Sequence, residues 1–386
     1  MTTVKQRANA HLPPKVMSTS GRLTIGFVGY GRVGKSTLLQ ALLNNKIDLS
    51  KRKTHPTSEL HVVSAHIYKC SFPNTPCYRS RVNGNVVPAL CGFPGHELNS
   101  MVLSRDVSFV DCPGEVQFAS TMLGALCLVD VIFILSTATG VFTQSPSFEL
   151  LAAANILGKK VVVIQSMIDS TNETRGMQCI EPLIIPISAW NRTNINEVCK
   201  VISDISVEEY DDHSPVGMLI YSNCTEVDQE SGDTILTIYG RLLKGTFKQN
   251  QRLEIRPGAV SLDEDGRPKC NPIIIELTSL ESEGGMPTSG SLISVKAAIN
   301  YDLVGNLVTD MTGYISGDVG SLPDVFSALE IKVSLLPFMF NPYTEELEVT
   351  SKILENEKLL MTIGMLSTSA TVRKVMDNAV IDFAIH

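Results

Sequence analysis

The sequence predicts an α/β domain with a doubly wound, mostly parallel sheet, followed by two β-barrel domains. Three observations support this prediction. A glycine-rich turn at residues 29–37 joins an apolar run, typical of a buried strand, to the apolar spacing of a helix. Strand and helix patterns then alternate as far as residue 207, which is typical of a parallel sheet. From residue 216 onward, short strand patterns are separated by Gly, Pro and Asp turns without a helical period.

The composition is that of an ordinary water-soluble protein. The 386 residues are 44% hydrophobic and 19% charged, and the length suits two or three domains. A net charge of −8 argues against a chain that coats nucleic acid through bulk electrostatics. Nine cysteines without paired spacing favour a reducing compartment, so we expect a cytoplasmic protein without membrane contact. Residues 1–20 are polar and lack the apolar core of a signal peptide, which predicts a disordered tail.

The first domain is expected over residues 21–207. Strand patterns fall at 23–28, 60–68, 107–110, 129–135, 160–164 and 183–187, and helix patterns at 38–43, 116–126, 146–157 and 195–203. An insertion at 70–104 is rich in Pro, Gly, Asn and Cys and is expected to build no core of its own. The acidic stretch 208–215 is predicted to be a linker, with one barrel at 216–323 and the next at 324–386.

The glycine-rich turn satisfies the phosphate-binding pattern G-x-x-x-x-G-K-[ST]. Glycines let successive N–H groups turn inward around phosphate oxygens, and the following helix adds the partial positive charge of its N-terminus. The lysine would reach the β- and γ-phosphates of a nucleotide, and the serine hydroxyl would bind Mg²⁺. The predicted nucleotide-binding residues of this turn are Gly29, Gly31, Arg32, Val33, Gly34, Lys35, Ser36 and Thr37. The alternative is a βα turn of another doubly wound domain, with Lys35 as a solvated charge.

A second pattern, Asp111-x-x-Gly114, follows the strand predicted at 107–110. A carboxylate there can bind Mg²⁺ through water, and the glycine N–H can contact a γ-phosphate. Thr57 lies in the polar loop between the two patterns, and its hydroxyl would complete the metal coordination. We therefore expect Ser36, Thr57 and Asp111 to hold Mg²⁺. The P-loop alone fits ATPases and GTPases alike, and Asp111 as a turn cap is the alternative.

Several short segments along the chain carry a resemblance to one family. They are IYKC at 67–70, CYRS at 77–80, FVDCPG at 109–114, ASTML at 119–123, residues 147–156, IRPG at 255–258, GSLP at 320–323 and IGMLST at 363–368. In these segments the chain resembles translational GTPases, and in particular the gamma subunit of eukaryotic and archaeal translation initiation factor 2. The resemblance implies a G domain that binds GTP or GDP with Mg²⁺, two β-barrels, and partner alpha and beta subunits. It also implies delivery of initiator methionyl-tRNA to the small ribosomal subunit.

The guanine-reading motif departs from the family pattern. The family has Asn-Lys-x-Asp, and this chain has Ser166, Met167 and Asp169 at the named positions. Asp169 can accept hydrogen bonds from the guanine ring, and Met167 can cover the base face, but Ser166 is too short to replace the asparagine amide. Ser188 and Ala189 match the family's second base-contacting loop. The resemblance therefore predicts guanine binding with weakened selectivity.

A second departure follows the D-x-x-G pattern. The family has a histidine there that helps to position the attacking water, and this chain has Glu115. Because a carboxylate near the γ-phosphate is repelled by it, we expect slow or absent GTP hydrolysis, with Glu115 and Thr57 as candidate catalytic residues. The alternative is that Glu115 points into solvent.

Cysteines in the insertion raise the question of a metal. Family members often carry a zinc knuckle here with paired C-x-x-C ligands. This chain has Cys70, Cys77 and Cys91, with His96 nearby, but lacks those pairs. We therefore expect ordinary reduced thiols rather than zinc.

The features that would bind tRNA are sparse. In the family, the aminoacylated end of the tRNA lies between the G domain and the first barrel, and the matching stretch at 290–310 holds one lysine beside two aspartates. Three other basic residues are expected on a solvated face: Arg241, Lys244 and Lys248. The family's final barrel also continues beyond residue 386, so the second barrel is expected to be shortened.

Two other functions remain open at this point. One is a pseudo-GTPase scaffold that has lost hydrolysis and much guanine selectivity and holds initiation-factor subunits or the ribosome together. The other is an elongation-factor-like carrier of another aminoacyl-tRNA, which would need a stronger basic groove.

Overall fold

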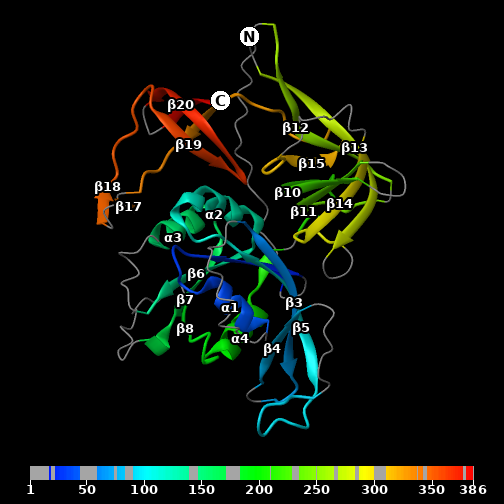
Figure 1. Cartoon of the computed structure of the whole chain (residues 1–386), viewed down its shortest axis with the longest axis vertical. Helices are drawn as coiled ribbons and strands as arrows, with labels where there is room; N and C mark the ends of the chain where they lie inside the picture. The colour runs from blue at the N-terminus through cyan, green and yellow to red at the C-terminus, as the bar shows by residue number, and fades with distance from the viewer. Residues whose placement is uncertain are drawn as a thin grey trace.

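The chain forms an α/β domain, a closed β-barrel and a smaller β unit, in that order (Figure 1). The computed structural model describes residues 17–18, 22–43, 59–73, 76–82, 90–138, 147–170, 183–208, 210–227, 234–248, 250–264, 268–282, 287–299, 310–336, 338–341, 346–376 and 380–385. The predicted fold class is confirmed.

A seven-stranded sheet forms the α/β domain, in the order β4-β3-β5-β2-β6-β7-β8. Its strands are β2 (Leu23–Val28), β3 (His61–Cys70), β4 (Tyr78–Val82), β5 (Met101–Asp111), β6 (Val131–Thr137), β7 (Lys160–Ser166) and β8 (Leu183–Pro186). The five strands from β5 to β8 in this order are parallel, and β3 and β4 run antiparallel at one side. Because the carboxyl ends of parallel strands meet at one edge, the turns after β2, β5, β7 and β8 share that edge.

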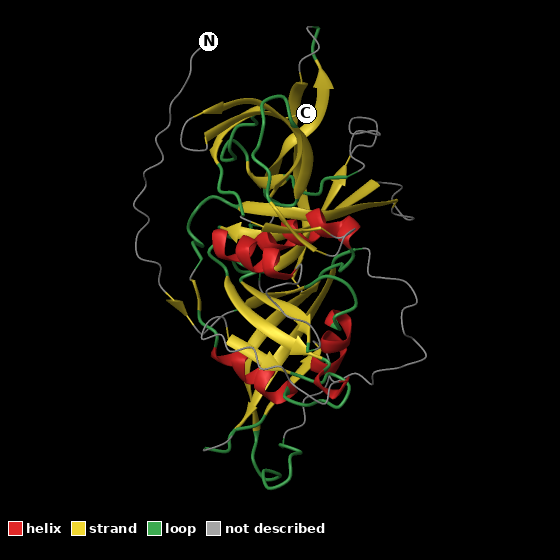
Figure 2. Cartoon of the chain, turned by 90° about the vertical axis from the view of Figure 1, so that its left-hand side faces the viewer, coloured by secondary structure: helices red, strands yellow, loops and turns green. Residues whose placement is uncertain are grey.

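Helices cover both faces of the sheet (Figure 2). On one face lie α1 (Lys35–Leu42) and α4 (Ile195–Asp204), and on the other α2 (Ala119–Ala125) and α3 (Ser147–Ile156). All six side chains of β2 are buried, because the strand is central and covered on both sides. Short 3₁₀ turns flank α2, namely η2 (Val116–Phe118) and η3 (Leu126–Leu128), and a third, η5 (Ile168–Ser170), follows β7.

The region predicted as a coreless insertion is a structured extension of the sheet. Strand β4 and the first part of β5 lie within it, and in Figure 1 the ends of β3, β4 and β5 project beyond the helices. A small buried cluster of three cysteines packs there against Phe72, Phe93 and Met101. The prediction for residues 70–104 was therefore wrong, because antiparallel pairing of β3 with β4 and β5 organises a segment whose composition is typical of loops.

Two short strands connect the chain's beginning to the end of the α/β domain. Strand β1 (Met17–Ser18) pairs antiparallel with β9 (Val207–Glu208). The prediction of a disordered tail is thus wrong for these two residues, and the rest of residues 1–20 lies outside the described part of the chain.

The barrel closes through six antiparallel strands in the order β10-β11-β14-β13-β12-β15. They are β10 (Gly217–Val227), β11 (Thr234–Lys244), β12 (Arg252–Leu262), β13 (Pro268–Ser282), β14 (Leu292–Ile299) and β15 (Ile315–Asp318). Its interior is filled by aliphatic side chains, including Met218, Ile238, Leu253 and Val295, which are fully buried. This interior is a packed core with the alternating inward pattern of a small barrel.

The last unit is a four-stranded sheet with a separate hairpin. The sheet has the order β16-β21-β20-β19 and comprises β16 (Ala328–Lys332), β19 (Lys358–Ile363), β20 (Leu366–Met376) and β21 (Val380–Ile385). The hairpin pairs β17 (Phe338–Asn341) with β18 (Glu346–Val349). Among the described residues this sheet does not close on itself, and only Ala370 and Val372 form its fully buried core.

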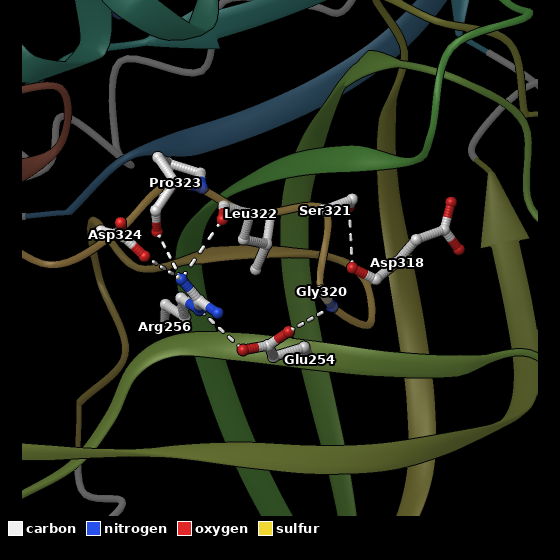
Figure 3. A network of polar contacts seen from close by, with 8 residues as sticks. All are labelled: Glu254, Arg256, Asp318, Gly320, Ser321, Leu322, Pro323 and Asp324. Carbon is white, nitrogen blue, oxygen red and sulfur yellow. Dashed lines mark hydrogen bonds and ion pairs between the residues drawn. The ribbon is translucent and has the colours of Figure 1, made fainter.

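A polar network fixes the connection between the barrel and this last unit (Figure 3). The Arg256 guanidinium donates to the carbonyls of Leu322, at 3.2 Å, and Pro323, at 2.8 Å. It also forms ion pairs with Glu254, at 2.6 Å, and Asp324, at 3.4 Å. Two of the segments that carry the family resemblance, IRPG and GSLP, are therefore in direct contact with each other.

The α/β domain, the barrel and the last β unit meet at helix α2. Met365, in the turn between β19 and β20, is buried in one cluster with Met122 of α2 and with Leu219 and Leu292 of the barrel. Gly124 allows this approach, because a Cβ there would lie 2.9 Å from the Gly364 carbonyl oxygen. The helix that follows the D-x-x-G turn is thereby packed against both β units.

Candidate functional site

The P-loop lies between the end of β2 and the start of α1. Its glycines adopt positive φ, with +148° at Gly29, +68° at Gly31 and +91° at Gly34. Other residue types rarely adopt this backbone, and at Gly29 a Cβ would also lie 2.6 Å from the Leu135 carbonyl oxygen. The backbone therefore needs glycine where the phosphate-binding pattern requires it.

Lys35 is a buried cation at the first turn of α1. Its Nζ donates to the Gly29 carbonyl at 2.6 Å and lies 3.4 Å from the Gly31 carbonyl oxygen. Burial lowers the pKa of Lys35, and the nearby Asp111 carboxylate opposes that change. A phosphate group would bring the additional negative charge that this buried ammonium lacks.

Two oxygen ligands suited to Mg²⁺ lie side by side. Ser36, in the first turn of α1, donates its hydroxyl hydrogen to Asp111 Oδ2 at 2.6 Å across the edge of the sheet. Hydroxyl and carboxylate oxygens are the ligands that Mg²⁺ prefers, so these residues fit the ion. Thr57, the third predicted ligand and a candidate catalytic residue, lies outside the described residues.

The turn that contains Gly114 lies directly against the P-loop. The Gly31 N–H donates to the Gly114 carbonyl at 2.7 Å. A Cβ at Gly114 would collide with Lys35 Nζ and lie 2.8 Å from the Gly31 carbonyl oxygen. Only glycine fits at this contact, which brings together the two patterns that are 75 or more residues apart in sequence.

The Glu115 side chain lies at the protein surface. Its carboxylate accepts a hydrogen bond from Gln117 Nε2 at 2.9 Å in an exposed position. This geometry corresponds to the alternative in which Glu115 faces solvent.

The Ser166 side chain is hydrogen-bonded to the P-loop. Its hydroxyl donates to the Val33 carbonyl at 2.6 Å, and the residue is 3% exposed. Sequence reasoning considered only whether this side chain reads the base and missed its link to the P-loop. Met167, at φ +61°, places its Cε 3.7 Å from the position a Cβ would take at Gly34. Asp169, in η5, is exposed and free of such packing.

The second predicted base loop lies beside the first. The Ile168 N–H donates to the Ile187 carbonyl at 3.3 Å, which joins the two loops where β7 and β8 end. Ser188 closes the second loop, because its Oγ accepts from the Asn191 N–H at 3.0 Å and its carbonyl from the Thr193 N–H at 2.9 Å. Ala189 follows at the rim, packed against the core of the α/β domain. The structure thus brings the P-loop, the Ser166 segment and the Ser188 segment to one edge of the sheet.

Four candidate metal ligands gather at the far end of β3 and β4. The ligand atoms of Cys70, Cys77, Cys91 and His96 all lie within 4.8 Å of one another. The Cys70 and Cys77 backbones are joined across the hairpin by an N–H to carbonyl bond of 2.8 Å. Sequence reasoning missed this cluster, because strand pairing rather than C-x-x-C spacing brings the four residues together.

The surroundings of the cluster lower the pKa of one of its thiols, at Cys70, and hold the histidine in place. Burial alone would raise the pKa of the Cys70 thiol, but N–H groups of Cys77 and Phe72 that point at its Sγ hold that pKa below its usual value. The His96 ring stacks on Phe72, with centroids 4.0 Å apart, and its Nδ1 lies 3.1 Å from Cys77 Sγ. Three sulfurs and one imidazole nitrogen form a donor set typical of structural zinc sites.

A buried ion pair joins the α/β domain to the barrel. Arg241 of β11 contacts Asp130, just before β6, and both also contact the Tyr210 hydroxyl. The side chains of Arg241 and Asp130 are 3% and 8% exposed, and Asp130 Oδ2 accepts from the Thr24 N–H at 2.7 Å. The prediction that Arg241 lies on a solvated face was therefore wrong, whereas Lys244 is exposed as expected. No local pattern marks Arg241, since its burial comes from contact with a different domain.

Within the described residues, every helix is too short or too polar to cross a lipid bilayer.

Comparisons with known proteins place the chain among translation factors. It is 30% identical over 394 residues to Drosophila melanogaster eukaryotic translation initiation factor 2 subunit 3, covering 94% of this chain and 82% of that protein. It is 28% identical to the Schizosaccharomyces pombe eukaryotic translation initiation factor 2 subunit gamma, covering 94% of this chain and 86% of that protein. No family model matches the chain.

Solved structures share the fold. A bacterial selenocysteine-specific elongation factor aligns with a TM-score of 0.59 at 14% identity, covering 94% of this chain and 53% of that chain, about half its length. Elongation factor SelB from Methanococcus maripaludis, solved with the GTP analogue GppNHp, aligns with a TM-score of 0.58 at 13% identity and 72% coverage of that chain. From the 30% identity across most of both proteins, the chain belongs to the family of the gamma subunit of eukaryotic translation initiation factor 2.

Proposed function

We propose that this chain binds guanine nucleotide with Mg²⁺ and acts as a gamma-type subunit in translation initiation. One observation carries the proposal: Ser36 donates to Asp111, and Lys35 lies against Gly114, so the P-loop and the D-x-x-G turn meet at the carboxyl edge of the sheet. Nucleotide sites of doubly wound domains lie at this edge.

Each residue of that set has a defined part in binding. Lys35 is held by the Gly29 carbonyl in a buried position, where its charge is little screened and attracts the β- and γ-phosphates. Mg²⁺, held by Ser36 and Asp111, would neutralise phosphate charge. Gly114 supports a nucleotide-dependent change, because its turn lies against the P-loop and any added phosphate oxygen near Lys35 must share that space.

Base recognition in the proposal depends on Asp169 and the Ser188 loop. The Ser166 hydroxyl already donates to Val33, so the guanine edge is left to Asp169 and to backbone N–H groups near Ala189. We therefore keep weakened guanine selectivity as part of the proposal. Hydrolysis in this proposal is slow, because the Glu115 carboxylate accepts a hydrogen bond from Gln117 in an exposed position and its negative charge is repelled by the γ-phosphate.

The proposed partners follow from family membership. They are the alpha and beta subunits of the initiation factor, initiator methionyl-tRNA and the small ribosomal subunit, and the proposed location is the cytoplasm. The names of the relatives support the initiation role. On the described surface the basic residues that would face tRNA remain few: Lys296, for example, is paired with Glu281 at 2.9 Å.

Equilibrium binding of GDP tests the nucleotide proposal. We expect the purified chain to bind GDP more tightly with Mg²⁺ than without it. Ser36→Ala should remove most of the Mg²⁺ effect and retain Mg²⁺-free binding, because Lys35 and the P-loop backbone are unchanged. Equal GDP affinity with and without Mg²⁺ in the original chain would contradict the assignment of Ser36 and Asp111.

We also propose that Cys70, Cys77, Cys91 and His96 hold one zinc ion, in place of the ordinary thiols expected from the sequence. Zinc there would be structural, because four protein ligands leave no open position for chemistry. Metal analysis of the full chain should find about one zinc per molecule, lost in Cys91→Ser. The variant Glu97→Gln, at an exposed residue beside His96, is the matched control, and zinc-free protein with all three cysteines reduced would overturn this assignment.

The scaffold function is the second candidate, and one observation favours it. The buried Arg241–Asp130 pair, the Arg256 network and the Met365 contact join the three units, and none of these contacts is made by a residue of the proposed nucleotide site. In that case the chain would bind partner proteins and no GTP or GDP. The GDP measurement above separates the two candidates.

A further inference from the structure

The chain contains a single tryptophan, and this side chain is exposed at the edge of the sheet that holds the proposed base site. Trp190 is 48% exposed, although it is the largest apolar side chain available for burial. It follows Ser188 and Ala189 directly. Single exposed apolar side chains are common on protein surfaces, and Phe326 is 63% exposed, so any role for Trp190 must follow from where it lies and not from its exposure alone.

The turn that carries Trp190 is fixed at three points. Ser188 accepts hydrogen bonds from the backbone N–H groups of Asn191 and Thr193. Arg192 donates from its guanidinium to the Ala41 carbonyl, at the end of α1, at 2.9 Å. Trp190 is therefore exposed on a turn whose backbone is held by hydrogen bonds and which is bonded to the end of helix α1.

The same turn lies next to the segment that would read the base. The bond from the Ile168 N–H to the Ile187 carbonyl joins the two loops, and Asp169 and Ser188 are the next residues on either side of it. Strands β7 and β8 are parallel neighbours, and Gln165 and Pro186 are their last paired residues. Trp190 and the exposed Asp169 therefore emerge from adjacent turns at one edge.

The side chains that replace the family's base-reading pair are already engaged. Ser166 donates its only hydroxyl hydrogen to the Val33 carbonyl, and Met167 packs its terminal methyl over Gly34. Because Ser166 cannot replace the asparagine amide of the family motif, the site needs another source of affinity for the ring. Stacking on an aromatic side chain supplies it, and every purine offers the same kind of face.

We propose that Trp190 stacks on the purine ring of the bound nucleotide and supplies affinity that does not depend on the base's polar edge. This inference rests on the proposed nucleotide site and adds a residue to it. It gives weakened guanine selectivity a physical basis, because stacking strengthens the binding of guanine and hypoxanthine nucleotides alike.

The single tryptophan gives a direct readout of this contact. Titration of the full chain with GDP, and separately with inosine diphosphate, is followed by Trp190 emission and by calorimetry. We expect both nucleotides to quench the emission with the dissociation constant that calorimetry gives. Trp190→Ala should weaken both by the same factor, about tenfold, and Trp190→Phe should restore most of the affinity. Phe326→Ala, which truncates a 63% exposed aromatic outside the site, is the matched control and should change neither.

The possible outcomes separate the inference from the function on which it rests. Normal GDP binding by the original chain, with unchanged emission and an unchanged affinity in Trp190→Ala, would overturn the inference and leave the nucleotide site intact. A loss confined to GDP would also overturn it, because an edge contact rather than stacking would then be responsible. If the original chain binds neither nucleotide by calorimetry, the proposed function itself fails. Thermal unfolding of each variant shows whether it is folded, and the emission of the original chain on GDP binding tests the contact even if Trp190→Ala does not fold.

Discussion

Replacing Arg241 with methionine tests whether the α/β domain and the barrel are held together by a buried charge pair. The substitution keeps much of the side-chain volume and removes the guanidinium. Asp130 is then left as a carboxylate that is 8% exposed, with the Thr24 N–H and the Tyr210 hydroxyl as its remaining partners. We therefore expect Arg241→Met to destabilise the chain strongly.

The size of the effect follows from the burial of the pair. Removing one partner of a buried ion pair destabilises proteins by about 3–5 kcal/mol, because the other charge remains desolvated. The two donors that Asp130 keeps place the expected loss near the lower end, at about 3 kcal/mol. With a urea dependence of about 3 kcal/mol per M, the unfolding midpoint should fall by about 1 M.

Urea unfolding followed by Trp190 emission measures this effect in the α/β domain. The midpoint is the readout, because a chain of three units need not unfold in one step. Lys296→Met is the matched control, since it removes a cation whose partner Glu281 is 63% exposed, and its cost should be below about 1 kcal/mol. Adding Asp130→Leu to Arg241→Met should cost less than the sum of the single changes, since no charge is then left unpaired.

The reasoning would be refuted by one clear pattern. If Arg241→Met lowers the urea midpoint by no more than Lys296→Met does, the buried pair contributes no more stability than an exposed pair. If the double variant equals the sum of its parts, Arg241 and Asp130 are not coupled.

Three further predictions concern the nucleotide site. Ser166→Ala removes the hydrogen bond to Val33 and should weaken GDP and inosine diphosphate equally, by about fivefold in calorimetry, whereas a loss confined to GDP would mean that Ser166 reads the base. Because burial lowers the pKa of Lys35 and phosphate needs its charged form, GDP affinity should fall as the pH rises in the alkaline range toward the ordinary lysine pKa of 10.5, with proton uptake on binding; an affinity that is flat over this range would contradict it. Glu115→His should raise GTP turnover by about tenfold or more in a phosphate-release assay, and unchanged turnover would show that this position is not limiting.

The parts of the fold that the sequence predicted are those encoded over short distances. Strand β2, the P-loop and α1 are adjacent, so the apolar run, the glycines and Lys35 together determine one local structure. The D-x-x-G turn could be placed at the same edge because parallel strands align their carboxyl ends. The change from a helical to a strand period near residue 216 likewise marked the start of the barrel.

The features that sequence reasoning missed depend on contacts between distant segments. The metal-ligand cluster exists because β4 pairs back on β3 and because Leu90 bridges to Ser100, and neither pairing is visible in cysteine spacing. Arg241 is buried by a domain that precedes it in the chain, so its strand pattern resembles that of any surface strand. At Ser166 the sequence indicated only the loss of a base contact. Its hydrogen-bond partner, the Val33 carbonyl, is a backbone group, which no sequence motif reveals.

Calorimetric titration of the full chain with GTP, GDP and ATP, in the presence of Mg²⁺, tests the central claim most directly. The account predicts dissociation constants on the order of micromolar for GTP and GDP, weaker binding of ATP, and loss of all three in Lys35→Ala, with thermal unfolding as the check that this variant is folded. Absence of binding, or binding that survives in Lys35→Ala, would contradict the proposed nucleotide site and leave the scaffold function as the remaining candidate.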